Sequence, residues 1–96
     1  MSVRMPKEKL TKEQEEAFNN VITLLKGMLQ DRSVPRNIKR LAQQGINIIN
    51  ESDDSPGILA SNVMYLVGDL SQDPNIPFHS RTVIYRIISL LETIKD

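Results

Sequence analysis

The residues best suited to chemistry lie together in one polar segment, residues 71–82. This segment holds the only histidine of the chain together with a carboxylate, an amide, a guanidinium and hydroxyls. Groups of these kinds near the start of a helix can bind an anion or a polar partner. The candidate partner contacts are Asp73, Asn75, His79, Arg81 and Thr82. A structural role is the simpler interpretation, because Asp-Pro-Asn favours a turn and hydroxyls near a helix start commonly cap it.

Templates for catalysis are poorly matched. A single histidine argues against the paired histidines of helical metal sites, and the absence of cysteine excludes thiolate ligands and thiol catalysis. A Ser-His-Asp triad around His79 would lack a nucleophile elbow, and there is no glycine-rich phosphate loop. We therefore predict a protein that is not an enzyme and has no catalytic residues, metal or cofactor. The remaining hypothesis, a small hydrolase or ligand site, requires His79, Asp73 and Arg81 to converge in a concave pocket.

A second polar feature is a basic run formed by Arg32, Arg36, Lys39 and Arg40. Four neighbouring cations can hold phosphates, so these residues are candidate phosphate contacts. They raise an alternative function, association with nucleic acid or the ribosome through the start of the second expected helix. No aromatic residue is interleaved among them, so no platform for stacking bases is visible. We favour a solvated surface that pairs with acidic residues elsewhere in the chain.

Helices must position both features. Pro35, Pro56 and Pro77 are spaced by 21 residues, and each precedes apolar residues at helical intervals. We compared the residues that lie three, seven, ten, eleven and fourteen positions after each proline and after Gln14, which stands one period earlier. Eighteen of these twenty residues are apolar. The pattern predicts helices at about residues 12–31, 35–51, 56–72 and 78–95. Short loops favour antiparallel neighbours, so we expect an all-α four-helix bundle over residues 11–96.

Local signals support these boundaries. Thr11 and Gln14 form a Thr-x-x-Gln capping box, and Ser55 is a natural N-cap before Pro56. The segment formed by residues 1–10 is short and rich in charged residues, so we expect it to be a flexible N-terminal tail. Gly45 falls on the apolar face of its helix, where close approach of another helix would explain a residue that costs about 1 kcal/mol relative to alanine.

Composition indicates a packed, cytoplasmic protein. The 96 residues suit one domain, and 40% apolar with 25% charged residues is ordinary for a globular fold. Neither a signal peptide nor an apolar stretch long enough to span a membrane is present. The net charge is zero, although residues 1–50 carry +4 and residues 51–96 carry −4. No global charge therefore favours nucleic acid or membrane as a partner.

The apolar sides of the first and last helices are wider than a minimal core stripe. They comprise Ala17, Phe18, Val21, Ile22, Leu24, Leu25, Met28 and Leu29, and then Val83, Ile84, Ile87, Ile88, Leu90, Leu91 and Ile94. A small bundle has difficulty burying so much apolar surface, so we expect a homodimer through one of these helices or a protein partner. The leading functional hypothesis is a non-catalytic bundle acting through protein–protein interaction or self-association.

Several of these residues also carry a family resemblance. Val34-Pro35-Arg36-Asn37-Ile38, the stretch Asp73-Pro74-Asn75-Ile76-Pro77 with His79, Arg81 and Thr82, and the closing Leu90-Leu91-Glu92 are similar to archaeal proteins of uncharacterised protein family 0147. The resemblance covers nearly everything from Thr11 onward. It implies a short four-helix bundle in a cytoplasmic archaeal setting, and it assigns no activity to any residue.

Overall fold

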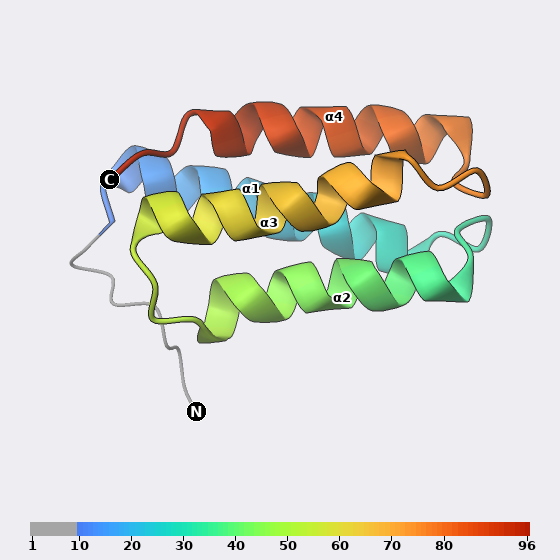
Figure 1. Ribbon diagram of the computed structural model, residues 1–96, viewed down its shortest axis with the longest axis horizontal. Coiled ribbons are helices and arrows are strands. Elements are labelled where there is room, and N and C mark those ends of the chain that lie inside the picture. Colours follow the sequence, from blue (N-terminus) through green and yellow to red (C-terminus); the bar gives the residue numbers. More distant parts are fainter. Residues whose placement is uncertain (1–9) are drawn as a thin grey trace.

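Four helices make up the part of the chain that the computed structural model describes, residues 10–96 (Figure 1). They are α1 (Lys12–Gln30), α2 (Arg36–Glu51), α3 (Pro56–Ser71) and α4 (Phe78–Glu92). Within the described range the chain has no strand. The prediction of four similar helices is confirmed, and the observed ends lie within three residues of the predicted ones. The local period of apolar residues is therefore a sufficient signal for the elements.

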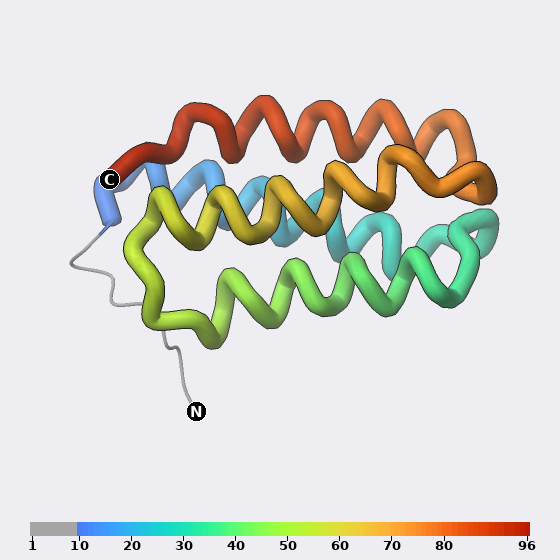
Figure 2. Tube along the Cα trace, in the orientation of Figure 1, coloured from blue at the N-terminus to red at the C-terminus, as the bar shows by residue number. Residues whose placement is uncertain are grey.

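Consecutive helices run antiparallel (Figure 2), and the contact between α1 and α4 closes the four helices into a bundle. Helix α1 packs on α2 and α4, and α3 packs on the same two helices. Helices α2 and α4 consequently lie at opposite edges of the bundle, as Figure 1 shows. Both the α1–α2 loop and the α3–α4 loop lie at one end of the molecule, because two antiparallel hairpins are packed side by side.

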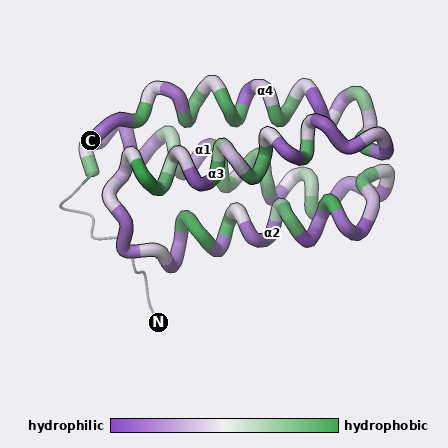
Figure 3. The backbone as a smooth tube through the Cα atoms, viewed as in Figure 1, coloured by the Kyte–Doolittle hydropathy of each residue, from purple (hydrophilic) through white to green (hydrophobic). Residues whose placement is uncertain are grey.

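The core is built from the periodic positions predicted from the sequence. Of those twenty residues, all are buried except Leu24, Leu66 and Ile88, which are half-buried. Figure 3 shows the result as hydrophobic and hydrophilic stretches that alternate along each tube. Loop residues Val34 and Ile76 and the late residue Ile94 complete the buried cluster. The wide apolar sides of α1 and α4 are thus buried or half-buried within the bundle itself.

Side chains of α1 and α3 pack closely against α2 at Gly45. A methyl group added at this position would lie 3.2 Å from Leu25 Cδ1 and 3.5 Å from Leu66 Cδ2. Leu25 is fully buried, so it has little room to move away. The space beside Gly45 is thus occupied by side chains of the neighbouring helices, and a side chain at position 45 would compete for it.

The end of the bundle opposite the two loops is closed by hydrogen bonds between distant segments. The predicted capping box is present, with Thr11 Oγ1 accepting from Gln14 N at 3.0 Å and Gln14 Oε1 accepting from Thr11 N at 3.1 Å. Ser55 occupies the N-cap of α3, but its side chain makes no capping hydrogen bond. Instead Asp96 accepts hydrogen bonds from Gly57 N at 2.7 Å and from Ser55 Oγ at 3.1 Å. The Asp96 carboxylate, about forty residues further along the chain, therefore caps α3.

The expected tail over residues 1–10 falls almost entirely outside the described residues. Leu10 is described, and its side chain packs half-buried against the core. Among residues 10–96, none of the four helices combines the length with the apolar composition that a membrane span requires.

Candidate functional site: two clamped loops and the surfaces beside them

The two loops at the shared end of the bundle have the same internal structure. In the first, Asp31 Oδ1 accepts from Ser33 N at 2.9 Å, and Asp31 O accepts from Val34 N at 3.2 Å. In the second, Asp73 Oδ1 accepts from Asn75 N at 2.8 Å, and Asp73 O accepts from Ile76 N at 3.2 Å. In each loop the aspartate thus folds the next three residues into a turn that ends at a buried aliphatic side chain.

Each loop aspartate also binds the helix that follows the other loop. Asp31 Oδ2 lies 2.7 Å from His79 Nε2, at the start of α4. In the reverse direction, Asn37 Nδ2 at the start of α2 donates to Asp73 Oδ2 at 3.4 Å. His79 and Asn37 both lie two residues after the proline that precedes their helix. The two contacts therefore join equivalent positions of the two hairpins, and we name them, together with the Ser33 bonds to Asp31, the loop clamp.

Hydrogen bonds to Asp31 determine the charge of the clamp. The Ser33 hydroxyl donates to Asp31 Oδ1 at 2.6 Å, and this bond, followed by the contacts with His79 and the Ser33 backbone, lowers the pKa of Asp31 to about 2. Asp31 is therefore a carboxylate at any ordinary pH. Its contact with His79 is a hydrogen bond when the ring is neutral and an ion pair when the ring is protonated. With side chains 62% and 30% exposed for His79 and Asp31, water screens this attraction.

The cluster of Ser33, Asp31 and His79 does not have the geometry of a catalytic triad. Ser33 Oγ lies 3.3 Å from His79 Nε2, the same ring nitrogen that contacts Asp31. In a triad the carboxylate and the hydroxyl use opposite nitrogens, so that the ring can take the hydroxyl proton while the carboxylate orients it. Here the hydroxyl donates directly to the carboxylate, so its proton is directed away from the ring. The arrangement holds the loop and does not activate the serine.

The contact residues predicted from the sequence are placed in different directions. His79 faces Asp31, which directly follows α1, whereas Asp73 faces Asn37 on α2. Arg81 Nε donates to the carbonyl oxygen of Ser71 on α3 at 3.2 Å. The convergence of His79, Asp73 and Arg81 that a hydrolase or ligand pocket requires is therefore absent. Asn75 and Thr82, the other two candidate partner contacts, are exposed.

Two neighbours of His79 in the clamp, Asp31 and Ser33, were not among the candidate residues predicted from the sequence. Their signal is the match between Asp31-x-Ser33-Val34-Pro35 and Asp73-x-Asn75-Ile76-Pro77, at a spacing of 42 residues. That spacing is two of the 21-residue intervals between prolines. The repeat pairs the two loops on the basis of the amino-acid sequence alone.

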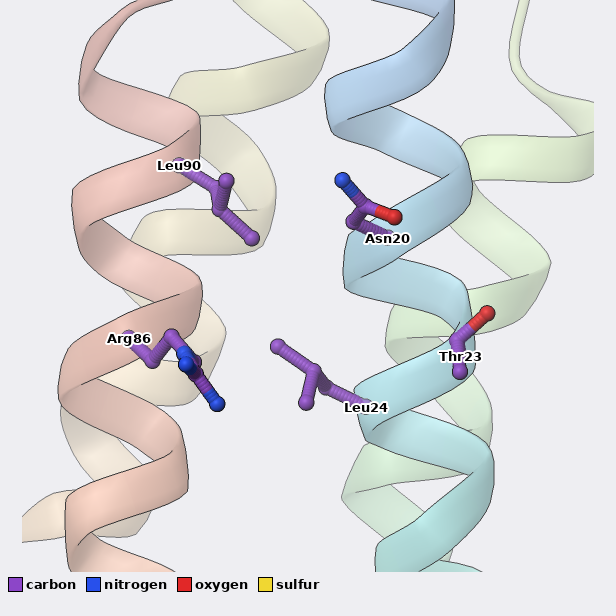
Figure 4. Close-up of a pocket in the computed structure, with 5 residues that line it drawn as sticks. All are labelled: Asn20, Thr23, Leu24, Arg86 and Leu90. Atoms are coloured by element: carbon purple, nitrogen blue, oxygen red, sulfur yellow. The ribbon is translucent and has the colours of Figure 1, made fainter.

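A shallow groove runs between α1 and α4 from the loop clamp toward the middle of the bundle. The part beside the clamp, about 260 Å³, is lined by Thr23, Leu24, Gly27, Met28, Asp31, His79, Ser80 and Val83. It continues into a second part of about 300 Å³ lined by Asn20, Thr23, Leu24, Arg86 and Leu90 (Figure 4). Leu24 and Leu90 project into this space from facing helices.

Residues 10–96 contain no group of three His, Cys, Asp or Glu side chains that could hold a metal.

The basic run lies on the surface beside the clamp. Arg32, Arg36 and Arg40 are exposed, and Lys39 is half-buried. Over the described range, none of these four side chains makes a hydrogen bond or an ion pair. The pairing with acidic residues that we expected from the sequence is not present there. Four cations therefore remain available beside one end of the bundle.

Large apolar side chains are exposed on only two of the four helices. In the described range they are Ile58 (51% exposed) and Tyr65 (81%) on α3, and Phe78 (81%) and Tyr85 (55%) on α4. Within each helix the two residues are seven apart, so they lie on one face. We name these four residues the α3–α4 apolar surface. Neither α1 nor α2 has a comparable exposed side chain.

Known proteins are similar to this chain in both sequence and fold. A family model described as "Uncharacterised protein family (UPF0147)" matches residues 5–94. A UPF0147 protein of Methanothermobacter thermautotrophicus is 42% identical over 84% of this chain and 79% of its own length. Another, from Sulfurisphaera tokodaii, is 40% identical over 85% of this chain and 92% of its own.

Two solved structures resemble the bundle over most of its length. The crystal structure of a protein from UPF0147 of Thermoplasma acidophilum has a TM-score of 0.81 at 32% identity, over 88% of this chain and 100% of that one. The crystal structure of MMP1188, described as a protein of unknown function, has a TM-score of 0.80 at 33% identity, over 85% of this chain and 93% of that one. The chain belongs to the family UPF0147, whose fold is this four-helix bundle.

Proposed function

We propose that the protein is a non-catalytic interaction module that self-associates through the α3–α4 apolar surface. The observation that carries this proposal is the concentration of all the large exposed apolar side chains of residues 10–96 on one hairpin. Tyr and other aromatic residues dominate the binding energy of protein interfaces, because they bury a large area at low entropic cost. Exposed large apolar residues at helical spacing on two adjacent helices, three of the four aromatic, are typical of such a surface.

Charge favours a second copy of the chain as the occupant. A two-fold interface brings the same residues of both copies together, so charged residues near its axis meet like charges. Helix α3 carries a single charged residue, Asp69, in its last turn, and its other exposed residues are uncharged. Helix α1, in contrast, exposes Lys12, Glu13, Glu16 and Lys26. Of the two helices that form the proposed surface, α3 therefore contributes few charges that would be desolvated or would meet like charges.

Sedimentation equilibrium tests this proposal. We expect the wild type to dimerise and the double variant Tyr65→Lys/Tyr85→Lys to be monomeric. Replacing one aromatic residue removes it from both copies of a two-fold dimer, so at about 1 kcal/mol per copy the dimer dissociation constant should rise roughly 30-fold. Asn19→Lys, which places the same charge on the exposed face of α1, is the matched control and should leave the dimer intact. A wild type that remains monomeric at its highest soluble concentration would refute the proposal.

A second candidate function is association with nucleic acid through the basic start of α2. One specific observation favours it: among the described residues, Arg32, Arg36, Lys39 and Arg40 have no carboxylate partner. Cations left unpaired on a surface are available for phosphates, whose binding releases condensed counterions. Binding of any nucleic acid at low salt, weakened by Arg36→Ala/Arg40→Ala, is the expected result.

A further inference from the structure

The outward face of α2 is polar in an unusual way. Its exposed residues are Arg36, Asn37, Arg40, Gln43, Gln44, Asn47, Asn50 and Glu51. Between Asp31 and Glu51 the chain has no acidic residue. The arginines of this face lie in the first two turns, amide side chains predominate in the later turns, and Glu51 is the last residue of the helix. Arginine forms paired hydrogen bonds with phosphates and with guanine, whereas asparagine and glutamine form them with adenine.

These residues form a row along the helix. Arg36, Arg40, Gln43, Asn47 and Asn50 are spaced by four, three, four and three residues, so they follow one line on the helix surface. At 1.5 Å per residue the row is roughly 20 Å long. A hydrogen bond from Gln43 Nε2 to Asn47 Oδ1 at 2.9 Å orders its middle. Arg32 precedes the row in the loop, and Lys39 lies on its flank.

The position of α2 in the bundle makes this row a ridge. Helix α2 lies at one edge of the molecule, opposite α4, and packs only its inner side on α1 and α3 (Figure 1). The aspartates of the loop clamp, Asp31 and Asp73, are engaged by His79 and Asn37 and do not pair with the arginines. A convex helix with a cationic end and an amide-rich middle fits a groove lined by phosphates.

We infer that α2 binds duplex DNA by inserting this ridge into the major groove. This inference rests on the second candidate function and assigns its ligand. An α-helix with its side chains is about 10–12 Å wide, and the major groove of B-form DNA is about 12 Å wide. The major groove of A-form RNA is too deep and narrow for side chains to enter. Single strands are disfavoured because the exposed face of α2 has no aromatic residue on which bases could stack.

The contacts divide by chemistry. Arg32, Arg36, Lys39 and Arg40 bind phosphates on the groove walls, where charge alone suffices. Gln43 and Asn47, in the middle of the row, present amides that both donate and accept, and they reach base edges in the groove. The salt dependence of binding therefore reports the four cations. If all four bind, log Kd changes with log salt with a slope of about 3.6, and affinity falls roughly 150-fold between about 50 and 200 mM salt.

Fluorescence anisotropy with a labelled DNA duplex of mixed sequence tests the inference. We expect Arg36→Ala/Arg40→Ala to reduce the slope by about 1.8 and to weaken binding at low salt about a hundred-fold. Arg36→Lys/Arg40→Lys should retain the slope. Lys26→Ala/Arg86→Ala, which removes two exposed cations from α1 and α4, is the matched control and should behave as the wild type. Far-UV circular dichroism verifies that each variant keeps its helix content.

Competition with other nucleic acids separates the outcomes. Duplex DNA should displace the labelled duplex, whereas duplex RNA and single strands of the same sequence should displace it far less. Preferential binding of either RNA or single strands would overturn the assignment to the DNA major groove but leave the second candidate function standing. Absence of binding to every nucleic acid at low salt, or equal weakening by the control variant, would overturn both. Neither result bears on self-association through α3 and α4.

Discussion

Replacing Gly45 by alanine measures how tightly α1 and α3 close on α2. Two opposing effects act at this position. Alanine is favoured over glycine inside a helix by about 1 kcal/mol, because it restricts the unfolded chain and shields the backbone. Against this, the new methyl group would lie 3.2 Å from Leu25 Cδ1, closer than ordinary van der Waals contact. Overpacking of this kind costs about 1–3 kcal/mol.

The burial of the neighbours determines which effect prevails. Leu25 is fully buried and has no solvent to move into, while Leu66 is half-buried and can shift outward. We therefore expect Gly45→Ala to lower the free energy of unfolding by about 0–2 kcal/mol. Gly27 and Gly68 provide matched controls, because a methyl group at either would meet nothing within 4 Å. Gly27→Ala and Gly68→Ala should each stabilise the protein by about 1 kcal/mol.

Urea unfolding followed by circular dichroism at the helix band gives the comparison. For a domain of this size, 1 kcal/mol corresponds to about 4–8 °C in melting temperature, so thermal unfolding offers a second readout. The slope of the free energy against urea should be the same in all variants, since none changes the area exposed on unfolding appreciably. If Gly45→Ala stabilises the protein as much as Gly27→Ala does, the helices are not closely packed at position 45 and the expected overpacking penalty is refuted.

Two further predictions concern the ends of the bundle. Thr11→Ala removes the hydroxyl that caps Gln14 N, and it should lower the free energy of unfolding by about 1 kcal/mol in the same urea experiment; an unchanged midpoint would contradict a capping role. Asp31 should titrate in an NMR experiment with a pKa of about 2, below its ordinary 3.8, and Ser33→Ala should move the pKa upward because it removes the strongest hydrogen bond. Because the folded-state pKa of Asp31 is depressed, its stabilising contribution is present above pH 3.8 and is lost as the pH falls toward 2. A pKa that does not change in Ser33→Ala would show that the serine hydroxyl does not hold the carboxylate.

Helix positions and core residues could be predicted from the sequence because both depend on local regularity. A residue three, seven or eleven positions after a proline at or just before the start of a helix faces the core whatever the rest of the chain does, provided the helix packs at all. The rule held even for its two exceptions, since Gly45 and Ser80 are buried as their positions required. Caps close in sequence, such as Thr11 with Gln14, were equally accessible.

Contacts between distant segments were decided by tertiary structure. His79 and Asp31 are separated by 48 residues, and they meet only because two antiparallel hairpins place their loops at one end. The cap of α3 by Asp96 has the same cause, because the end of the chain returns to the start of that helix. Periodicity identifies which face of a helix is buried but not which helices lie beside it. It therefore could not reveal which polar side chains would hydrogen-bond to one another.

The exposed surfaces were also set by packing. From the sequence, the wide apolar sides of α1 and α4 suggested where self-association would occur, yet the bundle buries or half-buries those residues. It leaves Ile58, Tyr65, Phe78 and Tyr85 outside instead. It likewise leaves the arginines of α2 without carboxylate partners in the described part of the chain. The amino-acid sequence by itself determined four amphipathic helices, because amphipathicity is a local property. Only the closure of those helices against one another decided which side chains remain free to bind, because exposure depends on what every neighbour covers.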